Sequence, residues 1–281
     1  MQNINTILIK YKNYLKKNNI SSAALDTELL LSSVINKSRE YLIINSKEEI
    51  EDIKIRKFQN LIERRKNREP IAYILKKKDF WKSTFYVDKN VLIPRPDTEI
   101  LIQEALKNTP KNRKISILDI GTGSGCILLS LLKERKKFKG TGIDISKNAL
   151  KVANFNAKIH QLKNRVKFIK SSVDNFFKDK YDLIISNPPY INKIDFKYLE
   201  RDVYKFEPAE ALKGGNDGLS IIKKVVERSS KLLKMNGKLI LEIGYDQKFR
   251  VEHMLKFKKF YINKIAKDYG NNNRCIICTK I

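Results

Sequence analysis

The sequence has few cysteines and no long apolar run. Its three cysteines, Cys126, Cys275 and Cys278, are too few for a disulfide framework or a four-cysteine zinc site, so we expect core packing for all three and no metal. No stretch reaches the roughly 20 apolar residues of a membrane span, and residues 1–17 lack the apolar centre of a signal peptide. These absences predict a cytoplasmic protein with no membrane partner.

Glycine is missing from the amino-terminal part of the chain, where none occurs before Gly121. Residues 1–75 show apolar residues at helical spacing, and a further helix is expected over 47–68. The first of these apolar series consists of Ile4, Ile7, Leu8, Tyr11 and Leu15. We interpret residues 1–78 as a small helical domain without catalytic residues. It either recognises a macromolecular partner or packs as an extension of the core, and pattern alone leaves both open.

Acidic residues are also in short supply, with 31 Asp and Glu against 58 Lys and Arg, which gives a net charge of +27. Such an excess first suggests nucleic acid. The excess is spread along the chain, however, with a net +8 over residues 1–93 and +19 over 94–281. We therefore interpret it as a drift in composition, and nucleic acid is not expected as the substrate.

The apolar period changes after residue 78. Residues 79–93 predict a β-hairpin linker, and Asp97 or Thr98 is expected to cap a helix that runs to Leu106. Strands and helices then alternate over 94–281, which predicts a mostly parallel sheet with helices on both faces. The expected strands are 115–120, 138–143, 166–169, 181–186, 237–243, 260–266 and 274–280, and the expected helices 125–133, 147–159, 217–233 and 245–257. Cys275 and Cys278 would then face opposite sides of a strand.

A glycine turn follows the strand over 115–120 and reads Gly121-Thr122-Gly123-Ser124-Gly125. Alternate glycines let the backbone approach a ligand closely at the start of a helix. The dinucleotide fingerprint needs glycine at the first, third and sixth places, but Cys126 occupies the sixth place here. Asp144, at the end of the next strand, suits the ribose hydroxyls of either kind of nucleotide.

The second motif follows the strand over 181–186 and reads Asn187-Pro188-Pro189-Tyr190. Two prolines end the strand ladder and stiffen a turn at the sheet edge where ligands bind. A planar amide could donate one hydrogen to the Asn187 side-chain oxygen and one to the Pro188 carbonyl, with Tyr190 against its flat face. We call residues 187–190 the clamp. Combined with the glycine turn, the clamp predicts S-adenosylmethionine as cofactor.

With these two motifs, the chain resembles the N5-glutamine methyltransferases of the HemK/PrmC family over nearly its whole length. The resemblance extends to Glu69-Pro70-Ile71-Ala72-Tyr73-Ile74-Leu75, Leu92-Ile93-Pro94-Arg95-Pro96-Asp97-Thr98-Glu99, Glu207-Pro208, Asp217-Gly218-Leu219 and Glu242-Ile243-Gly244. The segment 94–99 is the most telling, because DNA adenine and ribosomal-RNA amino methyltransferases with a similar tetrapeptide usually lack it. Arg95 and Glu99 are expected to tie the two domains together, to border the active site or to lie at the surface, and Glu242 is expected in a structural or supporting position.

The resemblance implies a class I S-adenosylmethionine-dependent methyltransferase, Rossmann-like, with a seven-stranded sheet over 94–281. The methyl group would go to the side-chain amide nitrogen of the glutamine in the Gly-Gly-Gln loop of class 1 peptide chain release factors. Cofactor-binding positions by this resemblance are Gly121, Thr122, Gly123, Ser124, Gly125, Asp144, Ser172 and Asn187. Substrate binding falls to Asn187, Pro188, Pro189 and Tyr190, and the catalytic role to Asn187, Pro188 and Tyr190.

Two positions depart from the family pattern. Lys76 stands where a glycine is usual, and Ser171-Ser172-Val173 stands where many members have an acidic residue and an aromatic residue near the adenine. The chain is expected to act as a monomer. Two other functions are weighed: an amino methyltransferase acting on DNA adenine or ribosomal RNA, and a basic binding module on a degenerate nucleotide fold. Intact glycine-turn and clamp motifs argue against degeneracy.

Overall fold

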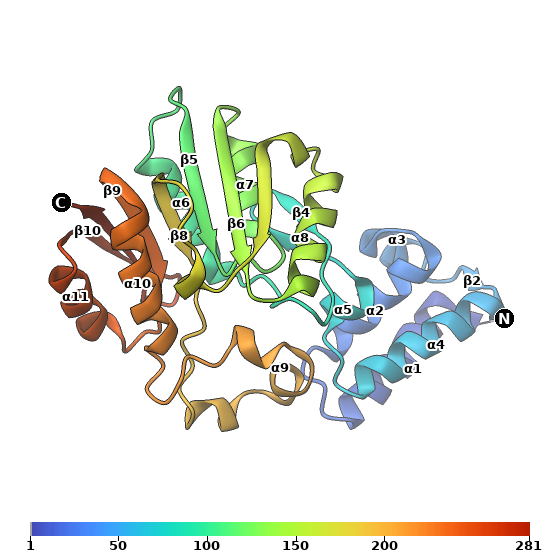
Figure 1. Cartoon of the computed structure of the whole chain (residues 1–281). Helices are drawn as coiled ribbons and strands as arrows, with labels where there is room; N and C mark the ends of the chain where they lie inside the picture. Colours follow the sequence, from blue (N-terminus) through green and yellow to red (C-terminus); the bar gives the residue numbers. More distant parts are fainter. Residues whose placement is uncertain (1) are drawn as a thin grey trace. The chain divides into compact units, whose positions relative to one another are not determined.

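The computed structural model describes residues 2–281, which group into two compact units (Figure 1). The first contains the residues up to Lys76 together with Arg201–Phe206. The second contains Lys77–Glu200 and Glu207–Ile281. No pattern in the sequence predicted that residues 201–206 would group with the amino-terminal residues rather than with their neighbours in the chain.

The first unit is helical around a small apolar core. Its helices are α1 (Ile4–Lys17), α2 (Ala23–Ile35), α3 (Arg39–Ile44), α4 (Asp52–Lys66), α5 (Ile71–Leu75) and α9 (Arg201–Phe206). Two short antiparallel strands, β1 (Gln2–Asn3) and β2 (Glu49–Ile50), also pair here. The helix expected over 47–68 was therefore placed too early, because residues 49–50 pair as a strand before α4 begins.

This unit contains no glycine, so residues of other types adopt the left-handed backbone conformation where the chain turns. Asn36 ends α2 at a φ of 58°, and Lys76 ends α5 at a φ of 55°. Asparagine tolerates this conformation, whereas lysine is strained by roughly 1–2 kcal/mol. Lys76 thus adopts the left-handed conformation that glycine takes at no steric cost.

Helix α9 is held in the first unit by a buried arginine. The Arg65 guanidinium donates to Asp26 and to Asp202 of α9, each at 2.6 Å. The side chains of Arg65 and Asp26 are 8% and 4% exposed, and that of Asp202 is 21% exposed. Because a buried charge without a partner is costly, this bridging arginine favours the docked position of α9.

The hairpin lies earlier than predicted. Its strands are β3 (Lys78–Phe80) and β4 (Ser83–Phe85), joined through Trp81 at a φ of 54°. Residues 86–93 contain no strand, so the predicted second half of the hairpin was wrong. Phe80 and Phe85 are buried in the core of the second unit, which explains why an apolar pattern marked this stretch.

The second unit is built on a seven-stranded, mostly parallel sheet, as predicted. Its strands are β5 (Ile115–Ile120), β6 (Phe138–Asp144), β7 (Val166–Lys170), β8 (Tyr181–Ser186), β9 (Leu233–Glu242), β10 (Phe260–Lys267) and β11 (Asn273–Lys280). The order is β10-β11-β9-β8-β5-β6-β7, and only β11 pairs antiparallel with its two neighbours. β-Branched and aliphatic residues fill the central strands because both faces of the sheet are covered.

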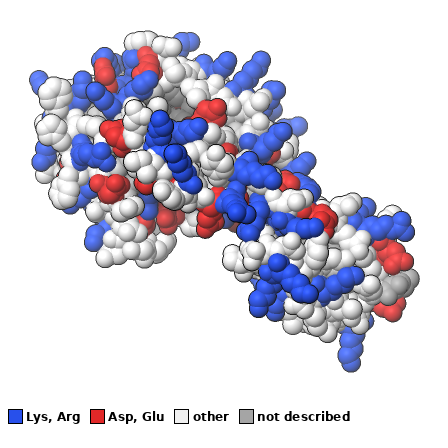
Figure 2. Space-filling view, turned by 90° about the horizontal axis from the view of Figure 1, so that it is seen from below, with Lys and Arg blue, Asp and Glu red and all other residues white. Residues whose placement is uncertain are grey.

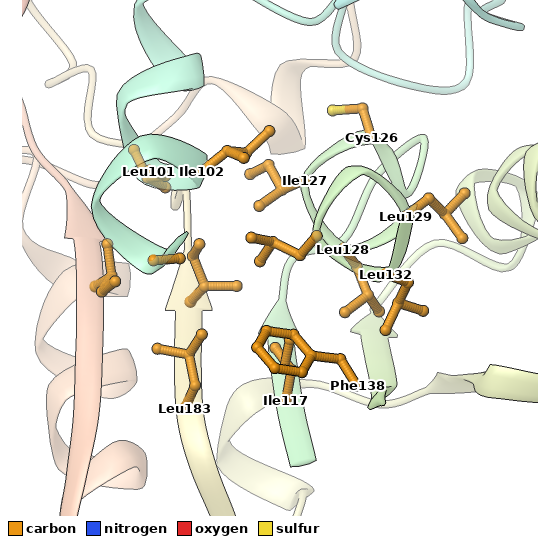
Figure 3. Packing of buried hydrophobic residues seen from close by; sticks show 14 of the residues in the cluster. Leu101, Ile102, Ile117, Cys126, Ile127, Leu128, Leu129, Leu132, Phe138 and Leu183 are labelled. Atoms are coloured by element: carbon orange, nitrogen blue, oxygen red, sulfur yellow. The ribbon is translucent and has the colours of Figure 1, made fainter. Parts of the chain in front are cut away.

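Helices cover both faces of this sheet. They are α6 (Glu99–Lys107), α7 (Cys126–Glu134), α8 (Lys147–Ile159), α10 (Ser220–Leu232) and α11 (Lys248–Phe257). Short 3-10 turns occupy Pro96–Thr98, Lys163–Arg165, Val173–Asn175, Asp195–Tyr198 and Ala209–Ala211. One core joins the sheet to α6, α7 and α8, as Figure 3 shows for Leu101, Ile127 and Leu183, and the other joins it to α10 and α11.

The cysteines are buried, as predicted. Cys126, the first residue of α7, and Cys275 of β11 belong to the core that includes α6 and α7, and Cys278 belongs to the core that includes α10 and α11. Cys275 and Cys278 therefore face opposite sides of β11. Within residues 2–281 no helix is both long and apolar enough to cross a membrane.

Two helices begin later than predicted, and both delays have a local cause. Helix α10 begins at Ser220 because Gly218 adopts a φ of 75°, a conformation that a helix does not contain. Helix α11 begins at Lys248 because the Gln247 side chain accepts the Gly244 backbone N–H at 2.9 Å and closes a turn first.

Candidate active site

The predicted site motifs meet at one edge of the sheet. Strand β5 lies between β6 and β8 in parallel, with Ile120 opposite Ile143 on one side and Ser186 on the other. The glycine turn follows β5, Asp144 ends β6 and the clamp follows β8. These three motifs therefore leave the sheet at neighbouring carboxyl ends, the edge where open α/β sheets bind ligands.

The glycine turn has the backbone that its sequence requires. Gly121, Gly123 and Gly125 adopt φ values of 74°, 53° and 79°, and each is left-handed. A Cβ at Gly125 would also lie 3.1 Å from Leu129. Between the glycines, Thr122 and Ser124 are buried. Because these side chains point into the protein, the outer surface of the turn is bare backbone, which suits close approach of a ligand.

Asp144 braces this turn. One carboxylate oxygen accepts the Gly123 backbone N–H at 2.9 Å, and the other accepts that of Ser146 at 2.9 Å. Burial raises the pKa of Asp144, and the bonds from Ser146 and Gly123 oppose that rise. Each oxygen keeps a lone pair for a further donor such as a ribose hydroxyl. Ser171 donates its backbone N–H to the Asp144 carbonyl at 3.0 Å, so Ser172 follows immediately beside this strand end.

A second carboxylate under the turn was not predicted. Asp119 is fully buried in β5, and its Oδ2 accepts the Thr122 hydroxyl at 2.6 Å. Within the described residues its Oδ1 has no hydrogen-bond partner. Burial raises the pKa of Asp119 to about 7, helped by the charge of Asp144 and opposed by the Thr122 hydroxyl. An acid inside an apolar strand just before a glycine turn was the signal that could have found it.

The side chain of Asn187 is held by Thr98. Its Nδ2 donates to the Thr98 hydroxyl oxygen at 3.0 Å, and Thr98 is 3% exposed. This bond uses the amino group of the Asn187 side chain, so the carbonyl oxygen Oδ1 is the atom left to accept a hydrogen from a ligand. Thr98 occupies the N-cap position of α6, which was one of the two predicted, but its side chain makes no capping hydrogen bond.

The backbone of the clamp is contacted by Gln247 and by glycines of the loop that follows the clamp. The Tyr190 carbonyl accepts the Gln247 side-chain amide at 3.0 Å, and the same amide donates to the Gly218 carbonyl at 3.2 Å. A Cβ at Gly214 would lie 2.8 Å from the Tyr190 Cα, so only glycine fits against the clamp there. Gln247 is 3% exposed, and it was not predicted as part of the site.

The Tyr190 phenol points to a buried carboxylate. Its hydroxyl donates to Glu242 Oε1 at 3.4 Å and accepts from the Arg274 guanidinium at 3.5 Å. Burial raises the pKa of Tyr190 far above its ordinary value, and the neighbouring Glu242 charge adds to that effect. The phenol is therefore neutral and acts as a flat, fixed ring.

Glu242 ends β9 and is 2% exposed. Burial raises its pKa to about 7. The Thr98 hydroxyl, the Arg274 charge and the Tyr190 hydroxyl oppose this rise, and the Asp97 charge adds to it. The supporting position expected for Glu242 is consistent with these contacts.

Arg95 and Glu99 are used elsewhere in the second unit. Arg95 forms an ion pair with the buried Glu207 at 2.5 Å, and Glu207 also accepts the Ile93 backbone N–H at 3.1 Å. Glu99 accepts the Trp81 backbone N–H at 2.7 Å. The segment 94–99 thus binds Glu207 through Arg95 and Trp81 through Glu99, and its Thr98 contacts Asn187 of the clamp.

Residues in each of the two units match a known protein family. The PrmC N-terminal domain family matches residues 6–75, and a methyltransferase domain family matches residues 111–276. A methyltransferase from Pyrococcus furiosus shares the fold with a TM-score of 0.54 at 19% identity, over 79% of this chain and 97% of that one. The ribosomal protein L11 methylase of Lactobacillus delbrueckii subsp. bulgaricus does so with 0.51 at 18% identity, over 69% and 83%.

Curated relatives are much closer in sequence. The chain is 38% identical to the release factor glutamine methyltransferase of Buchnera aphidicola subsp. Acyrthosiphon pisum, over 96% of both proteins. It is 39% identical to that of Fusobacterium nucleatum, over 98% of this chain and 78% of the relative. A bifunctional methyltransferase of Rickettsia felis is 37% identical over 99% of this chain, which spans only 58% of that longer protein.

The fold and the paired motifs at its sheet edge define a methyltransferase. The chain belongs to the family of release factor glutamine methyltransferases.

Proposed function

We propose that this protein transfers a methyl group from S-adenosylmethionine to the side-chain amide nitrogen of the glutamine in the Gly-Gly-Gln loop of class 1 peptide chain release factors. Such a transfer would modulate translation termination in the cytoplasm, with the enzyme acting as a monomer. The observation that carries the proposal is the bond from Asn187 to Thr98, which leaves Asn187 Oδ1 to accept a hydrogen from a substrate amide.

The residues at the sheet edge suit the cofactor. The bare backbone of Gly121–Gly125 and the free lone pairs of Asp144 fit the amino-acid and ribose parts of S-adenosylmethionine. Ser172, beside the end of β7, is assigned to the adenine. When bound, the cofactor supplies a methyl group on a positively charged sulfur.

The clamp would do its work by orientation. An amide nitrogen is a poor nucleophile because its lone pair is delocalised into the carbonyl. Accepting its two hydrogens at Asn187 Oδ1 and the Pro188 carbonyl, with the ring of Tyr190 against its face, holds the nitrogen in line with the methyl group. Orientation of this kind lowers barriers by about 7–11 kcal/mol in favourable cases. The proton leaves after transfer, so no general base is assigned.

Labelled methyl transfer tests the proposal. Purified class 1 release factor should take up label, and the same factor with its loop glutamine changed to alanine should not. Label found only in DNA or ribosomal RNA would replace the proposal with the nucleic-acid amino methyltransferase. The charge gives that alternative little support, because Lys and Arg are spread over the face in Figure 2 with Asp and Glu among them.

Replacing Asn187 with alanine should reduce methyl transfer at least 100-fold, because the substrate amide loses an acceptor and its orientation. The measurement is single-turnover methylation of release factor, with thermal unfolding as the check on folding. Asn154→Ala, which removes an exposed asparagine side chain from α8, is the matched control and should keep full activity. Normal turnover by Asn187→Ala would contradict the role given to the clamp.

A further inference from the structure

The side chain of Gln247 forms three hydrogen bonds with the backbone at and around the clamp. Its Oε1 accepts the Gly244 backbone N–H at 2.9 Å. Its Nε2 donates to the Tyr190 carbonyl at 3.0 Å and to the Gly218 carbonyl at 3.2 Å. Gln247 is 3% exposed. Each of the two amide hydrogens thus has its own acceptor, and the amide oxygen has a donor.

These partners also fix the orientation of the Gln247 amide. If its nitrogen and oxygen exchanged places, the oxygen would face two carbonyls and the nitrogen would face an N–H group. The Gln247 backbone N–H donates to the Gly244 carbonyl at 3.1 Å, which closes the turn of residues 244–247 after β9. The amide is therefore attached to the end of one strand of the sheet and reaches the clamp from there.

Glycines let the loop that follows the clamp lie against the same part of the chain. A Cβ at Gly218 would overlap the Tyr190 carbonyl oxygen and would lie 2.7 Å from Gln247 Nε2. Gly214 donates its backbone N–H to the Ile191 carbonyl at 2.8 Å. The carboxyl-terminal end of the clamp is therefore held between Gln247 and this loop.

The turn of the clamp is thus fixed at both ends. Ser186, just before the clamp, is paired with both neighbouring strands, β5 and β9. Tyr190, at the other end, is held by Gln247. Between them the two prolines restrict φ to about −65°. The position of the Pro188 carbonyl, which is proposed to accept one hydrogen of the substrate amide, then depends on where the Tyr190 end is held.

We propose that Gln247 is a positioning residue for methyl transfer: it holds the carboxyl-terminal end of the clamp at the sheet edge and so directs the Pro188 carbonyl to the substrate amide. This inference rests on the proposed function and deepens it. Gln247 acts through the backbone of the clamp, and its substitution should change the rate of transfer more than the binding of release factor.

Two substitutions of Gln247 test its bonds. Gln247→Glu keeps an oxygen for the Gly244 N–H but turns its other oxygen to two carbonyls, and Gln247→Met removes all three bonds without adding a charge. Each should lower kcat by about 10- to 100-fold and leave KM for release factor within about threefold, because displaced acceptors cost rate. The control is Gln161→Glu, the same change at an exposed residue of the same unit, which should keep the wild-type kcat.

A purely structural role would affect the amount of folded enzyme and not its turnover. Rates are therefore expressed per folded molecule, counted from the amplitude of thermal unfolding, and the positioning role predicts a loss on this scale. Gly218→Ala displaces the Tyr190 carbonyl from the other side while Gln247 is kept, and it should lower turnover per folded molecule about as much. This variant keeps the test decisive if the Gln247 variants fold poorly.

Hydrogen exchange without substrate separates this inference from the proposed function. The Ile191 N–H donates to the Leu212 carbonyl at 3.2 Å, and the Gly214 N–H donates to the Ile191 carbonyl. Both amides should exchange about tenfold faster in Gln247→Glu and Gln247→Met than in the wild type, measured by NMR. A wild-type enzyme that labels no release factor would contradict the proposed function, and exchange would still show whether Gln247 holds the clamp. Unchanged exchange of both amides, or wild-type turnover per folded molecule in Gln247→Met, would overturn the positioning role.

Discussion

Two buried carboxyl groups at this sheet edge, those of Asp119 and Glu242, keep their protons to a higher pH than exposed carboxyl groups do. Asp119 and Glu242 are carboxyls, yet burial raises the pKa of each to about 7. Both lie within β-strands, at or near the carboxyl ends from which the site is built. Because burial disfavours the ionised form of a carboxyl group, the folded protein becomes less stable as these two acids ionise.

Asp119→Asn should flatten the dependence of stability on pH. The folded protein holds the Asp119 proton up to about pH 7, whereas the unfolded chain releases it near pH 4. The stabilisation from this proton is complete below pH 4 and is lost as the pH rises through 7. The variant should therefore gain on the order of 2–4 kcal/mol over the wild type between pH 4 and pH 8.

Urea unfolding at a series of pH values measures this gain. The exposed Asp246, changed to asparagine, serves as the control. Parallel curves for Asp119→Asn and the wild type across this range would show that the Asp119 carboxyl is ionised in the folded protein throughout.

The residues that sequence predicted and those it missed differ in kind. Asn187, Asp144 and the glycines stand in motifs whose backbone or chemistry is unusual, so their letters alone mark a site. Thr98 and Gln247 carry ordinary letters, and their roles beside the clamp depend on which groups the fold brings against them. A threonine before a helix predicts a cap, and only the arrangement of β8 and β9 turns its hydroxyl to Asn187.

Helices and strands likewise divide into those that local sequence pattern predicts and those that depend on contacts with distant residues. Strands β5 and β8 and helix α8, with its Ser146 cap, have the predicted bounds because local pattern decides them. Helix α9 was not predicted. Its six residues lack a long amphipathic pattern, and it is held by Arg65, which lies far away in sequence.

Asp202→Asn should loosen α9 without unfolding the rest of its unit. Arg65 keeps its bond to Asp26, so the buried guanidinium is still paired and the global cost is small. The α9 amides should exchange with solvent about tenfold faster, which corresponds to a loss of about 1.4 kcal/mol of local stability. Hydrogen exchange with mass spectrometry measures this for α9 and α4 separately.

The control for that experiment is Glu200→Gln, which removes an exposed acid just before α9. It should leave the exchange of α9 unchanged. Equal exchange of α9 in Asp202→Asn and the wild type would mean that the bond to Arg65 does not hold this helix.

At the scale of the whole molecule, the first unit has no motif for chemistry, and we propose that it recognises the release factor. A hollow of about 540 Å³ lies between α1 and α4. It is lined by Lys10, Tyr11, Asn13, Tyr14, Lys17, Gln59 and Glu63. The exposed lysines at its border, Lys10 and Lys17, suit an acidic segment of a protein partner.

Reversing both charges at this hollow, with Lys10→Glu and Lys17→Glu together, should raise KM for release factor by about tenfold and leave kcat unchanged. The reason is that rim charges act on encounter with the partner and not on the transferred methyl group. The same double reversal on α11, Arg250→Glu with Lys256→Glu, alters the net charge equally and should leave KM within about twofold of the wild type. If both double variants raise KM alike, the overall positive charge attracts the substrate and the first unit has no special part in recognition. If kcat falls in the first variant, the charges at the hollow influence the transfer step itself, which recognition alone does not explain.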